Sequence, residues 1–89
     1  MPKVQLTERF VEDASAIWSD RVLAHVNRVV RLLESFPLMG STDVPQSIIR
    51  EFGTNVRKCV IAPFDLVYEY DELHDTVAVY GLVPCAHAT

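Results

Sequence analysis

The basic side chains in the second half of the chain are the groups best suited to chemistry. Arg50, Arg57 and Lys58 are the only Lys or Arg residues after position 49, and all three lie in segments predicted to be strands of one sheet. Guanidinium and ammonium groups on one face of a sheet could hold a phosphate or an acidic side chain. Neighbouring strand residues point to opposite faces, so at most one of Arg57 and Lys58 joins such a site. Isolated solvated charges beside an apolar strand are an equally good interpretation.

The three histidines predict no metal site. His25, His74 and His87 are far apart in the chain and lack the spacing of metal ligands. His87 follows the last predicted strand, where the end of a sheet could form a site, so it is either a site residue or a tail residue. The chain also lacks H-E-x-x-H, G-x-G-x-x-G, the P-loop and G-x-S-x-G. No motif indicates a cofactor.

A second basic group follows one side of a predicted helix. Arg21, Arg28 and Arg31 lie opposite its apolar side, and Leu32 falls among them with no core position to explain it. This surface is either a solvated face or a docking face for an acidic partner.

The first half of the chain predicts a short strand and two amphipathic helices. Alternation over residues 3–6 indicates the strand. Thr7 is the expected N-cap of the first helix. Its apolar positions recur at helical spacing, namely Phe10, Val11, Ala14, Ile17 and Trp18. Ser19 and Asp20 begin a longer helix that ends near Phe36, before Pro37, and its apolar arc comprises Val22, Val26, Val29, Val30, Leu33 and Phe36.

The second half of the chain predicts a loop over residues 37–47 and then strands with a period of two. Residues 48–52 are a short strand candidate, and the three longer strand segments are 56–62, 64–70 and 76–83. Turns lie at 53–55 and 71–75. Sequential strands joined by short turns favour an antiparallel meander. With both helices on one face, we expect a single two-layer α+β domain over residues 1–89, in the order β-α-α-β-β-β.

The composition indicates a compact cytoplasmic protein. Hydrophobic residues make up 49% and charged residues 22%, which excludes a disordered chain. No apolar stretch approaches the ~20 residues of a membrane span, and the opening residues lack the apolar core of a secretory signal. The net charge of −4 means that any contact with nucleic acid must depend on a local patch. Cys59 and Cys85 are expected to be buried thiols.

Several segments carry a resemblance to a known family when taken in order. They are Val-Gln-Leu-Thr-Glu-Arg-Phe-Val-Glu-Asp (4–13), Leu-Leu-Glu-Ser-Phe-Pro-Leu-Met-Gly (32–40), Ile-Arg-Glu (49–51), Phe64–Asp71 and 77–83. Together they cover nearly the whole chain, which resembles the RelE/ParE superfamily of small toxins from type II toxin–antitoxin modules. The resemblance implies a toxin that is neutralised by a cognate antitoxin.

The resemblance also implies a choice between two targets. Family members either cleave mRNA in the ribosomal A site or inhibit DNA gyrase, and the nucleases use basic residues of the sheet and often a C-terminal Tyr or His. On that pattern Arg50, Arg57, Lys58 and His87 are the candidate catalytic residues. Asp65 stands where an arginine commonly precedes Leu-Val-Tyr, and a carboxylate repels the phosphate that the reaction must stabilise. We therefore favour action by protein binding over RNA cleavage.

The predicted partner surface lies on the longer helix. An exposed apolar groove between the helices and the sheet edge is expected to take a helix or strand of the antitoxin, with Arg21, Arg28, Arg31 and Leu32 as contact residues. Assembly as a dimer or a heterotetramer is left open. The alternative function is a non-toxic binding or scaffold domain that keeps the toxin fold.

Overall fold

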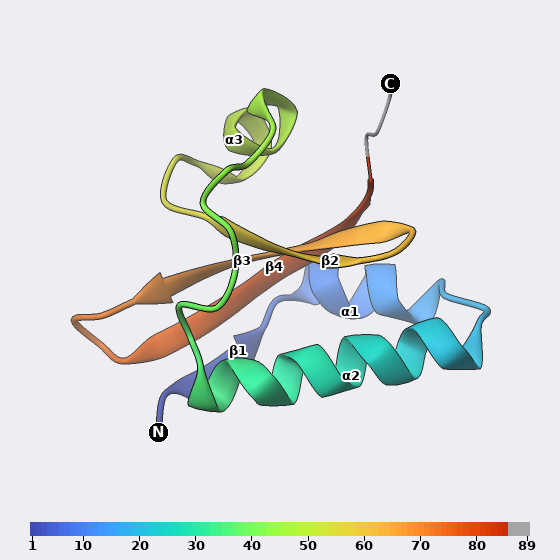
Figure 1. Ribbon diagram of the computed structural model, residues 1–89, viewed down its shortest axis with the longest axis horizontal. Helices are drawn as coiled ribbons and strands as arrows, with labels where there is room; N and C mark the ends of the chain where they lie inside the picture. The colour runs from blue at the N-terminus through green and yellow to red at the C-terminus, as the bar shows by residue number, and fades with distance from the viewer. Residues whose placement is uncertain (86–89) are drawn as a thin grey trace.

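Four strands form one mixed sheet in the computed structural model, which describes residues 1–85. The strands are β1 (Lys3–Leu6), β2 (Arg57–Ile61), β3 (Phe64–Asp71) and β4 (Thr76–Pro84). They lie in the order β1-β4-β3-β2 (Figure 1). β2, β3 and β4 form the predicted antiparallel meander, and β1 joins it at one edge by parallel pairing with β4.

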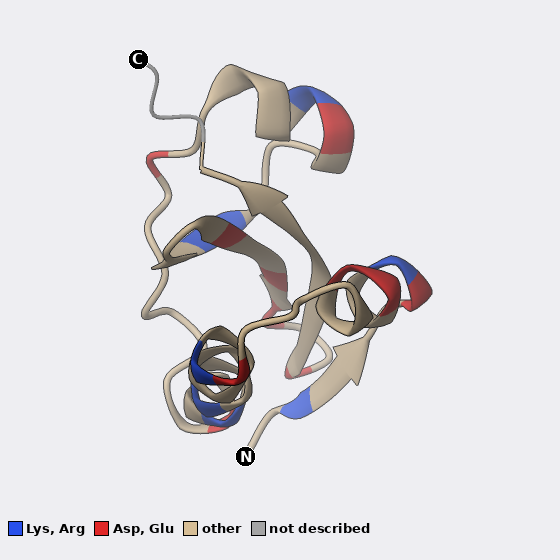
Figure 2. Cartoon of the chain, turned by 90° about the vertical axis from the view of Figure 1, so that its right-hand side faces the viewer, with Lys and Arg blue, Asp and Glu red and all other residues tan. Residues whose placement is uncertain are grey.

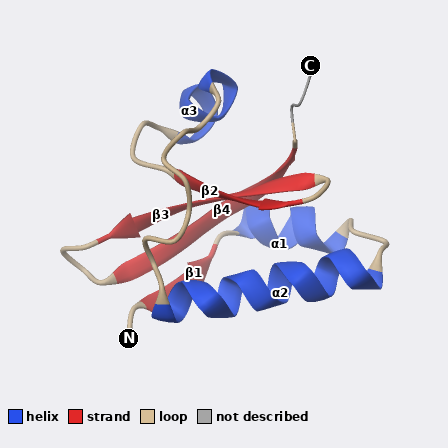
Figure 3. Cartoon of the chain, viewed as in Figure 1, coloured by secondary structure: helices blue, strands red, loops and turns tan. Residues whose placement is uncertain are grey.

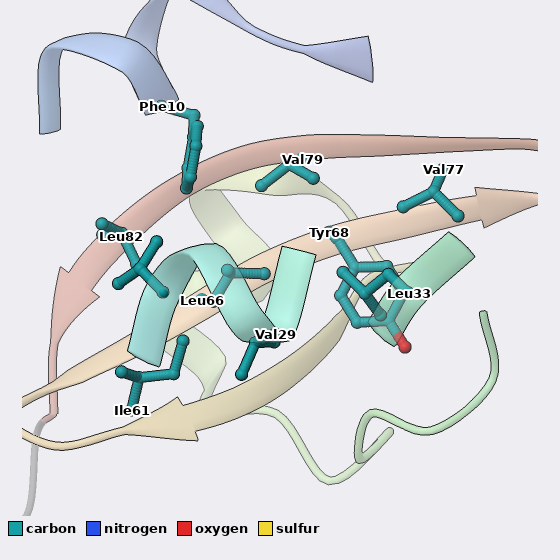
Figure 4. Close-up of a cluster of buried hydrophobic side chains, with 10 residues drawn as sticks. Phe10, Val29, Leu33, Ile61, Leu66, Tyr68, Val77, Val79 and Leu82 are labelled. Atoms are coloured by element: carbon teal, nitrogen blue, oxygen red, sulfur yellow. The ribbon is translucent and has the colours of Figure 1, made fainter. Parts of the chain in front are cut away.

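Two helices cover one face of this sheet, as predicted (Figure 3). They are α1 (Glu8–Ser15) and α2 (Asp20–Ser35), and the side chains of Thr7 and Ser19 accept the expected capping hydrogen bonds. Between helices and sheet lies the main core (Figure 4), whose fully buried members include Val26, Leu33, Ile61, Leu66, Tyr68, Val77 and Val79. Over residues 1–85, every helix is too short or too polar to cross a membrane.

Residues 48–52 form part of a helix, so the strand predicted there is wrong. Helix α3 (Gln46–Phe52) follows Pro45 and ends at Gly53, whose φ of 103° suits glycine. Ile48 packs with Val56 and Val67 in a second core on the opposite face of the sheet from α1 and α2. The sheet therefore has helices on both faces. The prediction of two layers is incomplete, because α3 forms a third layer over part of the sheet.

The predicted apolar stripe of α1 is only partly buried. Phe10 lies in the core and Ile17 packs against it, but Val11 is 52% exposed and Trp18 is 95% exposed. Because α1 ends at Ser15, the helical spacing does not continue to Trp18.

A bulge in β4 lets both cores form. The pairing changes from Val67 with Gly81 to Tyr68 with Val79, so Tyr80 is an extra residue in β4. Val79 and Leu82 consequently both face the main core, although their odd spacing would place them on opposite faces of a regular strand. Tyr80 belongs to the α3 side, where its ring stacks on Phe52 with centroids 6.1 Å apart.

Helix α1 caps the edge of β4 beyond the end of β1. The Asp13 carboxylate accepts a hydrogen bond of 3.0 Å from the Leu82 amide. A Cβ atom at Gly81 would lie 3.0 Å from the same carboxylate, so a side chain there would push the Asp13 side chain away from its position. Arg9 on the same helix pairs with Glu51 and lies 5.0 Å over the Phe52 ring, which ties α1 to α3.

Asp13→Ala tests this cap. The variant leaves the Leu82 amide without its charged acceptor, and we expect a loss of about 1–3 kcal/mol in the free energy of unfolding measured with urea. Glu12→Ala, on the exposed side of the same helix, is the control and should stay within about 0.5 kcal/mol of wild type. Equal stabilities of the two variants would contradict the cap.

Candidate functional site

Tyr68 fastens the segment after α2 to the sheet. Its ring is fully buried, and its hydroxyl donates to the Pro37 carbonyl and accepts from the Gly40 amide, both at 2.8 Å. A Cβ atom at Gly40 would lie 2.7 Å from the Tyr68 ring and hydroxyl and 3.0 Å from the Lys58 carbonyl. Residue 40 must therefore be glycine for the chain to approach so closely. We call residues 37–41 the latch segment.

Arg57 holds the same latch segment from the neighbouring strand. It pairs with Tyr68 across β2 and β3, and its Nη1 donates to the carbonyls of Leu38 (3.3 Å) and Gly40 (2.9 Å). Ser41 and Lys58 exchange two backbone hydrogen bonds of 2.9 and 3.0 Å. Contacts from Tyr68, Arg57 and Lys58 thus fix the backbone of the latch segment. The Nη1 group of Arg57 acts in them as a structural donor.

The fixed backbone turns its polar groups inward and its apolar side chains outward. Leu32, Phe36, Leu38 and Met39, which we call the apolar platform, line a shallow hollow of about 560 Å³ together with Pro37. Phe36 is 59% exposed, so its predicted place on the buried apolar arc of α2 is wrong. The reason is that the backbone leaves the helical conformation at this C-cap residue. Exposed apolar patches of this kind mark interaction surfaces.

The predicted catalytic residues do not gather on one face. Lys58 pairs with Val67, which belongs to the core under α3, whereas Arg57 pairs with Tyr68 of the main core. The prediction that these two side chains point to opposite faces is therefore confirmed. Arg50 is exposed on α3, so its predicted position on a strand is wrong. His87 lies outside the described residues.

Carboxylates lie on the α3 side of the sheet. Asp65 is only 4% exposed, and its Oδ1 lies 3.4 Å from the Cys85 sulfur, which donates to it. Asp65 and Glu51 both line a small cavity of about 80 Å³ beside α3. Desolvation and the Asp65 carboxylate raise the pKa of the Cys85 thiol, while Lys58 acts in the opposite direction.

The cysteines are poor nucleophiles at neutral pH. Burial raises the pKa of the Cys59 thiol to about 11, and the Cys85 thiol also has a raised pKa, so both stay protonated. In the part of the chain that the structure describes, no group of three or more His, Cys, Asp or Glu residues could hold a metal ion.

The predicted partner residues all lie on one helix. Arg21, Arg28, Arg31 and Leu32 are all exposed on α2, and the arginine segments of this helix, coloured blue, lie on the side turned away from the sheet (Figure 2). Leu32 is also part of the apolar platform. Sequence reasoning missed the other platform residues, although Leu38 and Met39, two apolar residues beside Pro37 in a predicted surface loop, were a signal.

Removal of the Tyr68 hydroxyl tests the latch. In Tyr68→Phe the Gly40 amide and the Pro37 carbonyl lose their partner, and we expect a loss of about 1–3 kcal/mol in the free energy of unfolding. The control is Tyr70→Phe, whose hydroxyl donates to Asp75 at an exposed turn, and it should change stability by less than about 0.5 kcal/mol. If both variants unfold at the same urea concentration, the latch does not stabilise the fold.

Alkaline pH gives an independent test of the buried phenol. Desolvation raises the pKa of Tyr68, so its contribution to stability is complete below the unfolded pKa of about 10 and is lost as the pH rises through the folded value. The chain has three tyrosines, and Tyr70→Phe with Tyr80→Phe leaves Tyr68 alone. Its phenolate absorbance should appear above pH 10, together with a falling urea midpoint. Ionisation at or below the pH of free tyrosine would contradict this account.

Comparisons with known proteins place the fold. No protein-family model matches the chain, and no curated protein matches its sequence. The structure is similar to that of the toxin–antitoxin complex RelBE2 from Mycobacterium tuberculosis, with a TM-score of 0.74 and 20% identity over 96% of this chain and 100% of that one. It is also similar to the intact Escherichia coli RelBE complex (TM-score 0.71, 12% identity, 98% and 100% covered). The isolated Escherichia coli RelE toxin is similar as well, with a TM-score of 0.74 and 11% identity over 99% of this chain and 88% of that one. The chain has the RelE toxin fold over nearly its whole length.

Proposed function

We propose that this chain is the toxin of a type II toxin–antitoxin pair and that it acts by binding a protein target. The fold supports the first part, because the similar structures include two toxin–antitoxin complexes and a toxin. Fold alone does not fix function, so the second part depends on the site. The main observation for action by protein binding is that the Arg57 guanidinium donates hydrogen bonds to the Leu38 and Gly40 carbonyls.

RNA cleavage would need several positive groups held around one phosphate. Arg57 faces the latch segment, and Lys58 lies on the other face of the sheet. On that other face, Asp65 and Glu51 add negative charge beside α3. Arg57 and Lys58, on opposite faces of the sheet, cannot stabilise the same phosphate. Arg50 lies on α3, on the Lys58 side, so at most two of these three basic residues share a face. This arrangement favours binding over catalysis.

The apolar platform suits a protein target. Its side chains are large, exposed and mounted on a backbone held by Tyr68 and Arg57. A fixed apolar surface loses little conformational freedom on binding, which favours affinity. DNA gyrase, one of the two targets that the family resemblance implies, is the first candidate to test.

Induction of the chain alone in bacteria tests the proposal. We expect growth arrest without codon-phased cuts in translated mRNA, as read by primer extension. Leu38→Ser with Met39→Ser should relieve the arrest, because substitution of central apolar contacts typically costs about 1–3 kcal/mol of binding. Leu73→Ser, an 87% exposed leucine at the β3–β4 turn, is the matched control and should stay toxic.

Two other results would change the assignment. Codon-phased cuts that vanish in Arg57→Ala or His87→Ala, with the variant still folded, would make the protein an mRNA endonuclease. Unaffected growth with wild-type protein present and folded would identify a non-toxic binding domain instead.

A further inference from the structure

One side of α2 carries an uninterrupted row of exposed residues from its first turn to its C-cap. Arg21, His25, Arg28, Leu32 and Phe36 recur at i, i+4, i+7, i+11 and i+15, and all five are exposed. At about 100° per residue the four helical positions, from Arg21 to Leu32, fall within about a sixth of the helix circumference. The C-cap residue Phe36 lines the same hollow as Leu32. The row lies beside the buried residues Val26, Val29 and Leu33. We call it the α2 strip.

The α2 strip is divided into a basic half and an apolar half. Arg21, His25 and Arg28 form the first half, and Leu32 and Phe36 lead directly into the apolar platform. The acidic residues of α2, Asp20 and Glu34, lie about 100° and 140° around the helix from Arg21. Within residues 1–85 the strip arginines take part in no salt bridge, although the chain as a whole carries a charge of −4. The basic half is thus a local patch of positive charge whose arginines form no ion pair within residues 1–85.

We propose that the α2 strip binds a partner helix that is acidic at one end and apolar at the other. Its acidic end would lie over Arg21 and Arg28, and its apolar end would fill the hollow of the apolar platform. This inference rests on the proposed function, since the expected source of the helix is the antitoxin. Such a helix covers the surface assigned to the target, so neutralisation would follow from direct occlusion.

A second copy of the chain does not fit the strip. Antiparallel packing of two α2 helices would place the Arg21 end against Phe36, and parallel packing would place arginine against arginine. Nucleic acid matches the basic half but offers nothing to the exposed leucine and phenylalanine. A membrane-surface helix buries an apolar face along its full length, whereas here the apolar and basic groups follow one another along one side.

Binding of the protein encoded in the adjacent reading frame tests the strip. The complex with the full chain would be titrated by calorimetry for Arg21→Glu with Arg28→Glu, and separately for Leu32→Ser with Phe36→Ser. Each double variant should weaken binding by about tenfold or more, and only the arginine variant should lose the salt dependence. Arg50→Glu, an exposed arginine on α3, is the matched control and should bind like wild type. Circular dichroism confirms that each variant is folded.

The failures of the two proposals are distinguishable. Growth arrest that the neighbouring protein relieves, with unchanged affinity in both strip variants, would overturn the strip and leave the toxin assignment intact. If the chain arrests no growth, the toxin assignment fails, and the strip is then tested with designed helical peptides of about 18 residues, slightly longer than α2. A peptide with glutamates in one half and leucines in the other should shift the α2 amide resonances more than a peptide with the same residues interleaved. Equal shifts, or stronger binding of duplex DNA or phosphatidylglycerol vesicles, would overturn the strip.

Discussion

The two hydrogen bonds of the Tyr68 hydroxyl are the constraint on which the interaction surface depends. Tyr68 lies in the middle of the central meander, and its partners at Pro37 and Gly40 belong to a loop that would otherwise leave the end of α2 freely. Each bond contributes only about 1 kcal/mol, but a buried amide or carbonyl left without a partner costs more than that. The loop is therefore held in one conformation, and its apolar side chains must face solvent or a partner.

The same latch segment also fixes the side chain of a basic residue of the sheet. Arg57 completes the latch by donating to two loop carbonyls. A guanidinium has several donors in a fixed plane, which suits it to bridge backbone carbonyls as well as phosphates. In this chain the Arg57 guanidinium bridges two backbone carbonyls. A fold known from toxin–antitoxin complexes here presents an exposed apolar surface beside the latch segment.

Local patterns in the sequence predict most of the elements but not the contacts between them. The caps at Thr7 and Ser19 and the alternation in β3 and β4 are local signals, and the structure follows them. Residues 48–52, Ile-Ile-Arg-Glu-Phe, are too short a segment for their pattern to separate a strand from a helix, and in the helix Ile48 packs with Val67. The partners of Tyr68 lie 28 and 31 residues earlier, so no local pattern could show the latch. The exposed α2 residues were predictable because helical periodicity places them directly, whereas a shared site for Arg50, Arg57 and Lys58 required knowledge of sheet faces and of α3.

Amide hydrogen exchange at Gly40 tests most directly whether the latch holds the platform in place. If the latch holds the platform, the Gly40 amide of the wild-type chain exchanges as slowly as amides in the centre of β3, since it opens only with the core. In Tyr68→Phe the same amide should exchange much faster, while the amides of α1 keep their rates relative to the rest of the chain. A Gly40 amide that exchanges in the wild-type chain as fast as the exposed turn at Leu73 would contradict the account.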